Sequence, residues 1–149
     1  AKEKDINLLR TFWEKIGSKV DVMEAKQHDY ILSITSHLPH LIAYNIVSTS
    51  LDAQDGIKSN IIKYSAGGLR DFTRIAASNP IMWRDIFIQN KNNASKMINK
   101  FIANLEDLKK AIESEDGKKL EKIFEKTKEI RKDIVEAGQD VKKPDFGRK

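Results

Sequence analysis

Residues 65–91, SAGGLRDFTRIAASNPIMWRDIFIQNK, are the most informative part of the sequence. The pair Gly67 and Gly68 lets the backbone take positive φ or approach a ligand closely. Residues 69–77 then predict a short helix with Arg70 and Arg74 one turn apart on one face. Two guanidiniums behind a bare glycine backbone suit an anionic small molecule, whereas the simpler interpretation is a turn followed by solvated arginines.

Downstream, capping signals and apolar spacing predict three more helices. Ser78, Asn79 and Pro80 are typical of a helix end, an N-cap and a proline at the first position of the next helix. Apolar residues at spacings of three and four then run through 98–112 and 120–134. A tight break at Asp116-Gly117 separates these runs, and Gly138 ends the second, so an antiparallel helix hairpin is expected.

Upstream, the spacing of apolar residues is also helical. A first amphipathic helix over 6–16 is closed by Gly17, and a long helical run extends from about residue 24 to residue 50. Pro39 should kink or split this run near Leu38, because proline lacks a backbone donor. A loop over 51–56 and a short helix over 57–64 follow. With no alternating strand pattern, the prediction is an all-α multi-helix bundle, one domain over 1–149 with an irregular tail at 139–149.

Composition limits the class of protein. The chain has 149 residues, of which 40% are hydrophobic and 33% charged, as in a globular domain. It has no apolar run near the ~20 residues that cross a bilayer, no signal-peptide pattern and no cysteine, so a cytoplasmic protein without membrane contact is expected. The net charge of +5 comes with alternating lysines and glutamates through 106–133, typical of solvated helix faces. Without a one-sided basic stripe, nucleic-acid binding is not expected.

A second motif, QHDYILSITSHLPHLIA at residues 27–43, carries His28, His37 and His40. Together with GGLRDFTRIAASNPIMWRDI it resembles the C-terminal domain of prephenate and arogenate dehydrogenases, the oxidative enzymes of tyrosine biosynthesis. The resemblance is dense from about residue 17 to residue 91 and continues as helical pattern. It implies a homodimer with intertwined helices, a substrate that is prephenate or arogenate, and a full oxidoreductase with an N-terminal Rossmann domain binding NAD or NADP.

That Rossmann domain is expected to be missing from this chain. No GxGxxG motif follows a strand here, and Gly67-Gly68 lacks the spacing of a dinucleotide loop. The chain is therefore interpreted as a C-terminal fragment or separately expressed domain that binds no cofactor and transfers no hydride alone. The family's histidine that serves the substrate hydroxyl belongs to the missing domain, so no catalytic residue is expected here.

The resemblance implies five substrate-binding residues. Arg74 matches an arginine that grips a prephenate carboxylate, against the alternative of an ion pair with Asp71. His37 matches a histidine lining the substrate side, against a purely structural role. Trp83 matches a position near the substrate side chain that is reached across the dimer, or it packs in the core with Phe87. The remaining two are Gly67 and Asp71, which match positions close to the substrate; Asp71 could equally orient Arg74 or Arg70.

His37 and His40 have metal-ligand spacing, but no third ligand accompanies them, so no metal is expected. His28 and Asp29 are expected to interact locally.

The alternative function is a non-enzymatic helical module that binds another protein through the hairpin of residues 94–137. That alternative assigns no role to the glycine pair or to Arg74.

Overall fold

The computed structural model describes residues 2–51 and 63–138, and every regular element within these ranges is a helix. This confirms the all-α prediction. In chain order the elements are α1 (Glu3–Lys15), α2 (Ala25–Leu32), a π-helical turn (Ser33–His37), α3 (Leu38–Leu51), α5 (Gly67–Thr73), a 3₁₀ turn (Arg74–Ala77), α6 (Pro80–Gln89), α7 (Lys91–Glu113) and α8 (Gly117–Glu136).

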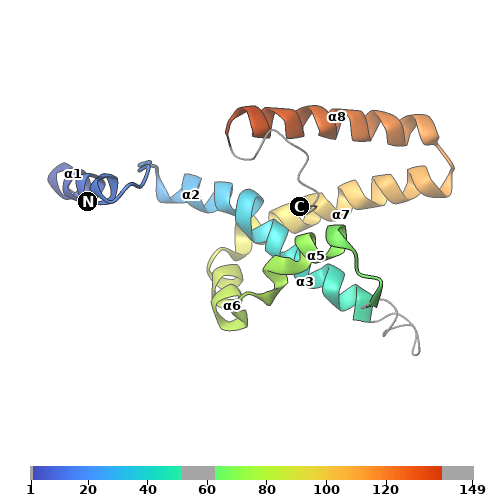
Figure 1. The fold of residues 1–149 in the computed structure, drawn as a ribbon, viewed down its shortest axis with the longest axis horizontal. Helices are drawn as coiled ribbons and strands as arrows, with labels where there is room; N and C mark the ends of the chain where they lie inside the picture. The colour runs from blue at the N-terminus through green and yellow to red at the C-terminus, as the bar shows by residue number, and fades with distance from the viewer. Residues whose placement is uncertain (1, 52–62, 139–149) are drawn as a thin grey trace.

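Helix α1 lies at one end of the molecule, apart from the other helices (Figure 1). Glu3 and Asp5 in its first turn complement the positive end of the helix dipole. It ends as predicted at Gly17, whose φ of +93° is in the left-handed region that glycine adopts without strain. Its apolar face remains largely open to solvent, since Leu9 is 60% exposed and Phe12 is 57% exposed.

The predicted long helix is continuous, but its hydrogen bonding changes before Pro39. Residues 33–37 form a π-helical turn between α2 and α3, and α3 begins at Leu38 (Figure 1). Pro39 has no N–H to donate to a carbonyl one turn earlier, so the preceding backbone adopts another pattern. Hydroxyl groups bond to carbonyls here, with Ser33 Oγ donating to Tyr30 O at 2.6 Å and Thr35 Oγ1 to Ile31 O at 3.0 Å. The proline therefore changes the helix type near Leu38 rather than breaking the helix.

The described core is small and lies where the π-helical turn, α3, α6 and α7 meet. Tyr44 on α3 ties this region to the start of α6 by donating a hydrogen bond from its hydroxyl to Ser78 O at 3.0 Å. Polar as well as apolar side chains are buried. The buried residues are Ser33, His37, Ala43, Trp83, Ala94, Met97 and Ala111.

Helices α7 and α8 form the predicted antiparallel hairpin (Figure 1). Asp116 caps α8 by accepting a hydrogen bond from Lys119 N at 3.0 Å, and the Lys119 ammonium pairs with Asp107 on α7 at 2.6 Å. The residue with positive φ in the turn is Glu115, at 53°, rather than Gly117, which is the first residue of α8. Gly138, with φ of +75°, ends α8 as predicted.

Two predictions fall outside the described ranges. The loop over 51–56 and the helix over 57–64 lie mainly on residues 52–62, and the irregular tail covers 139–149. Within the described ranges, none of the helices combines the length and the apolar character that spanning a membrane requires.

Candidate functional site

The segment with the glycine pair differs from its prediction. Gly67 and Gly68 are the first two residues of α5, two positions before the predicted helix start at residue 69, and the positive-φ glycines of the described chain are Gly17 and Gly138. The helix starts here because Ala66 takes an extended N-cap conformation and its carbonyl accepts a hydrogen bond from Arg70 N at 3.1 Å. A Cβ at Gly68 would meet no atom within 4 Å. The positive φ that glycine allows is therefore not adopted at this pair, whereas a close approach to a ligand there stays a prediction.

Residues 67–77, called here the Arg74 segment, present charge to solvent. Arg74 opens the 3₁₀ turn and is exposed, and no ion pair forms at its guanidinium within the described part of the chain. Asp71 pairs instead with its neighbour Arg70, with Nε and Oδ1 3.4 Å apart and both side chains exposed. Of the alternatives for Asp71, the structure supports the contact with Arg70.

Helix α6 places Trp83 in the core. The Asn79 side chain caps the helix by accepting hydrogen bonds from Ile81 N at 2.9 Å and Met82 N at 3.1 Å, and Pro80 occupies the first helical position. Because α6 begins at Pro80, Trp83 faces α3, and the residue is only 5% exposed. The ring stacks on His40, with centroids 3.7 Å apart and planes at 24°, and contacts Phe87 at 5.6 Å. Of the two interpretations of Trp83, the structure shows the contact with Phe87, and the role beside the substrate stays a prediction.

His37 is buried beside the same rings. It is 7% exposed and presents the edge-to-face geometry favoured by aromatic pairs, 6.1 Å from Trp83 and 6.2 Å from Phe87. Burial is the main cause that lowers the pKa of His37, because the charged imidazolium loses its hydration. Asp29 raises this pKa, whereas His28 and His40 lower it.

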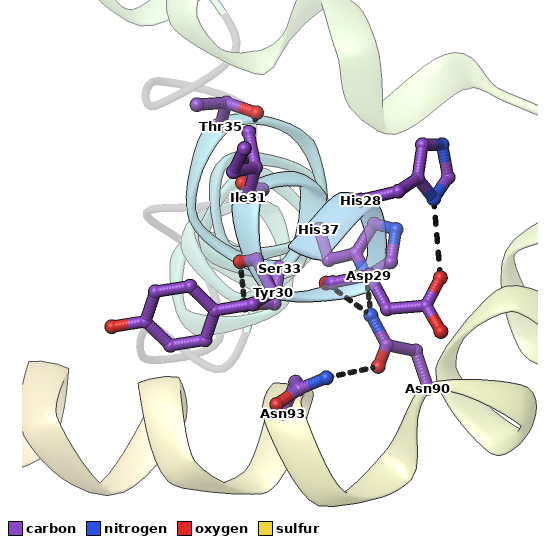
Figure 2. Close-up of polar contacts among 9 residues, drawn as sticks. All are labelled: His28, Asp29, Tyr30, Ile31, Ser33, Thr35, His37, Asn90 and Asn93. Atoms are coloured by element: carbon purple, nitrogen blue, oxygen red, sulfur yellow. Dashed lines mark hydrogen bonds and ion pairs between the residues drawn. The ribbon is translucent and has the colours of Figure 1, made fainter. Parts of the chain in front are cut away.

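Asn90, at the junction of α6 and α7, connects His37 to the neighbouring helices through side-chain hydrogen bonds. Figure 2 shows its side chain lying between the helix that carries His37 and the helix that carries Asn93. Asn90 Nδ2 donates to Asp29 O at 2.7 Å and lies 3.3 Å from His37 Nδ1, while Asn93 Nδ2 donates to Asn90 Oδ1 at 2.9 Å. We call His37, His40, Trp83, Phe87 and Asn90 together the His37 cluster.

A cavity of about 450 Å³ opens beside this cluster. Both His37 and Trp83 line it, and Trp83 Nε1 is a buried donor without a hydrogen-bond partner among the described residues. An unpaired buried donor is destabilising in the free protein and is satisfied when an acceptor reaches it. The lining residues are His28, Asp29, Leu32, Ser36, His37, Trp83, Ile86, Gln89 and Asn90.

The structure brings together two of the five predicted site residues. His37 and Trp83 share the cavity, whereas Gly67, Asp71 and Arg74 are not among its lining residues. Asn90 was not predicted from the sequence, because it follows His37 by 53 positions in the chain. Its side chain carries no local signal beyond an asparagine at a helix end, so only information on residues that vary together would have linked it to His37.

The other predicted contacts of the motif are local. His28 Nδ1 lies 3.1 Å from Asp29 Oδ1 in an exposed pair, as expected. His40 Nδ1 lies 2.9 Å from the Ser36 carbonyl oxygen, one turn earlier. Within residues 2–51 and 63–138 no group of at least three His, Cys, Asp or Glu side chains is placed to hold a metal ion.

Comparison with known proteins places these segments in a family. The model of the prephenate dehydrogenase dimerization domain matches residues 24–126. Cyclohexadienyl dehydrogenase of Zymomonas mobilis is 39% identical over 126 residues, which are 85% of this chain and 43% of that protein. Prephenate dehydrogenase of Bacillus subtilis is 33% identical over 109 residues, 73% of this chain and 29% of that protein.

Solved structures give the same result. Prephenate dehydrogenase from A. aeolicus, in complex with hydroxyphenyl propionate and NAD+, superposes with a TM-score of 0.82 at 39% identity, covering 90% of this chain and 46% of that one. Synechocystis arogenate dehydrogenase has the same fold, with a TM-score of 0.78 at 21% identity. The chain thus spans less than half the length of these relatives. The matched region covers both the histidine motif of residues 27–43 and the segment that carries Arg74. This chain belongs to the prephenate dehydrogenase dimerization-domain family.

Proposed function

We propose that this chain supplies the dimerisation and substrate-binding part of an enzyme that oxidatively decarboxylates prephenate or arogenate. The observation that carries the proposal is the cavity beside the His37 cluster. Two separate sequence motifs converge on it, and both lie in the region matched by the family model. The domain extent of 1–149 remains a prediction that accompanies this proposal.

The reaction divides naturally between this chain and a nucleotide-binding domain. Hydride leaves the ring carbon that bears the hydroxyl, carbon dioxide departs, and the ring becomes aromatic. NAD or NADP, bound by that other domain, would accept the hydride. The residues here do not fit the dinucleotide, because the sequence has no GxGxxG motif after a strand. This chain's task is to bind and orient a dianionic substrate.

The proposed site residues suit different parts of that substrate. The cavity at His37 and Trp83 offers aromatic walls and polar nitrogens to a ring with oxygen substituents. Arg74 offers a planar cation that can bind a carboxylate through two hydrogen bonds. Gly67 and Asp71 lie on the same segment as Arg74. Because the Arg74 segment does not line the cavity of its own chain, we propose that a second copy completes the site.

The exposed surface supports a homodimer. Large apolar side chains on α7 and α8 are open to solvent in the single chain, where Leu105 is 54% exposed, Ile112 is 62% exposed and Phe124 is 56% exposed. Permanent dimers bury apolar faces of this kind against a second copy.

Sedimentation tests the dimer directly. We expect the 149-residue chain to sediment as a dimer at micromolar concentration, because burial of the exposed apolar faces stabilises the associated form. A folded, stable monomer under these conditions would contradict the assembly that the proposal requires.

Substrate binding is tested in the complete enzyme. His37→Ala should raise the KM for prephenate or lower kcat, with the KM for the nicotinamide cofactor nearly unchanged, because that cofactor binds to another domain. Thermal unfolding measured in parallel separates loss of binding from loss of fold. A variant that loses stability but keeps normal kinetics per folded molecule would show that His37 is structural.

A further inference from the structure

The neutral His37 ring has one nitrogen that donates a hydrogen bond and one that accepts. Its pKa is lowered by burial and by the nearby His28 and His40, against the opposing effect of Asp29. The neutral ring therefore predominates near neutral pH. The position of its single proton decides whether His37 offers a donor or an acceptor to the cavity that it lines.

The side-chain amide of Asn90 has only one orientation that satisfies its neighbours. Its Nδ2 donates to the Asp29 carbonyl oxygen at 2.7 Å, and its Oδ1 accepts from Asn93 Nδ2 at 2.9 Å (Figure 2). A half-turn of the Asn90 amide would put two acceptors against each other at the Asp29 backbone carbonyl, which can only accept whichever way the Asn93 amide is turned. Asn90 Nδ2 therefore faces His37 Nδ1, 3.3 Å away.

The two hydrogens of Asn90 Nδ2 then have separate acceptors. One is directed to the Asp29 carbonyl oxygen and the other to His37 Nδ1. A nitrogen that accepts this hydrogen cannot carry its own proton in the neutral ring, so the proton resides on Nε2. We propose that Asn90 is a positioning residue that holds His37 as the Nε2–H tautomer, so that the cavity receives a hydrogen-bond donor.

The donor identifies the chemistry that it recognises. His37 Nε2 has no hydrogen-bond partner among the described residues, and His37 lines the cavity. A neutral N–H donor fits an oxygen acceptor of the substrate, whether carboxylate, carbonyl or ring hydroxyl, and the hydrogen bond is strongest to a carboxylate. The identification of this acceptor with a substrate oxygen rests on the proposed function, whereas the tautomer itself does not.

Nitrogen NMR of the whole 149-residue chain, labelled with ¹⁵N at histidine, measures the tautomer. Protonated and unprotonated ring nitrogens differ strongly in chemical shift, and the signals of His37 among the three histidines are those lost in His37→Gln. We expect wild-type His37 to show an unprotonated Nδ1 and a protonated Nε2. In Asn90→Asp the new side chain has no hydrogen to donate, so we expect a proton on His37 Nδ1.

The matched control is Asn92→Asp, which adds the same charge to the same turn of α7 at an exposed position. It should leave the His37 tautomer as in wild type. A proton on Nδ1 of the wild-type ring, or an unchanged tautomer in Asn90→Asp, would overturn the proposal. If Asn90→Asp does not fold, the wild-type spectrum alone still decides.

Kinetics of the complete enzyme separate this inference from the proposed function. Glutamine places an amide donor close to the position of Nε2, whereas asparagine places it close to Nδ1. We expect His37→Gln to retain at least threefold more affinity for prephenate than His37→Asn. Equal, wild-type KM values in both variants, together with the expected tautomer, would refute substrate binding at His37 and leave the role of Asn90 intact.

Discussion

The His37 cluster and the Arg74 segment contain the predicted site residues, and the chain holds them in opposite ways. In the cluster, rings pack at 3.7 to 6.2 Å and an asparagine joins three helical elements. In the Arg74 segment, the charged side chains are exposed and the ion pair is between sequence neighbours. The side chains of the His37 cluster are positioned by packing within a single chain. The position of the Arg74 guanidinium depends instead on what binds it.

The largest effect that this comparison predicts is on stability at Trp83. Trp83→Ala should lower the free energy of unfolding by about 3–5 kcal/mol, because it removes a buried aromatic side chain and leaves a cavity between His40 and Phe87. Urea unfolding of the 149-residue chain at one fixed protein concentration measures this loss.

Trp13→Ala is the matched control for that substitution. The Trp13 side chain on α1 is 48% exposed, so its loss should cost less than about 1 kcal/mol in the same chain. Equal losses at the two tryptophans would mean that the His37 cluster is not the better packed region.

The second prediction concerns substrate affinity and the Arg74 segment. In the complete enzyme, Arg74→Ala should raise the KM for prephenate tenfold or more, a loss of ~1.4 kcal/mol or more, with a smaller change in kcat. The substrate keeps its carboxylates in the ground and transition states, so the contact acts mainly as uniform binding. Stability should change by less than about 0.5 kcal/mol, because the side chain is exposed.

Two variants sharpen this result. Arg74→Lys should recover only part of the affinity, because an ammonium keeps the charge but not the two-pronged geometry. Arg84→Ala is the control, since Arg84 is exposed and pairs with its neighbour Asp85 at 2.8 Å. If Arg74→Ala stays within twofold of the wild-type KM, or if Arg84→Ala has the larger effect, Arg74 does not hold the substrate.

The same two regions show what the sequence could predict. Helix ends were correct at Gly17, Asn79 and Gly138, because caps and left-handed residues act over one turn of chain. The antiparallel hairpin was correct because apolar spacing over many residues is a strong signal. The helix after the glycine pair was predicted to begin at residue 69 and begins at Gly67, because glycine permits a positive φ without requiring it and Ala66 provides the cap conformation that starts α5.

The parts that could not be predicted depend on contacts across the fold. Asn90 meets His37 only after α6 and α7 are packed against the π-helical turn, and no local pattern encodes that meeting. The π-helical turn itself arises where Pro39 interrupts the hydrogen bonding of a helix that its neighbours still hold in place. The family motif pointed to His37 and Trp83, but their shared cavity is a property of the packed structure.

The smallest predicted effect is the pH dependence contributed by His37. Its pKa in the folded chain is lowered from the usual 6.5, mainly by burial. The unfolded chain therefore binds the proton more readily than the folded chain. Above the unfolded-state pKa this group has no effect, and as the pH falls through and below it the folded state loses stability relative to the unfolded state.

The measurement is the difference in unfolding free energy between wild type and His37→Gln, followed from about pH 7.5 down to about pH 5.5, the range in which histidine titrates. All other charged residues are present in both proteins, so the difference reports what the His37 ring and its contacts contribute. The wild-type chain should lose stability more steeply than the variant on acidification, by up to about 1.4 kcal/mol for each unit by which burial lowers the pKa. Parallel curves would mean that the imidazolium is tolerated in the folded cluster. A wild type that gains stability relative to the variant would mean that Asp29 raises the pKa of His37 by more than burial lowers it. The His37 ring that lines the cavity would then carry a positive charge.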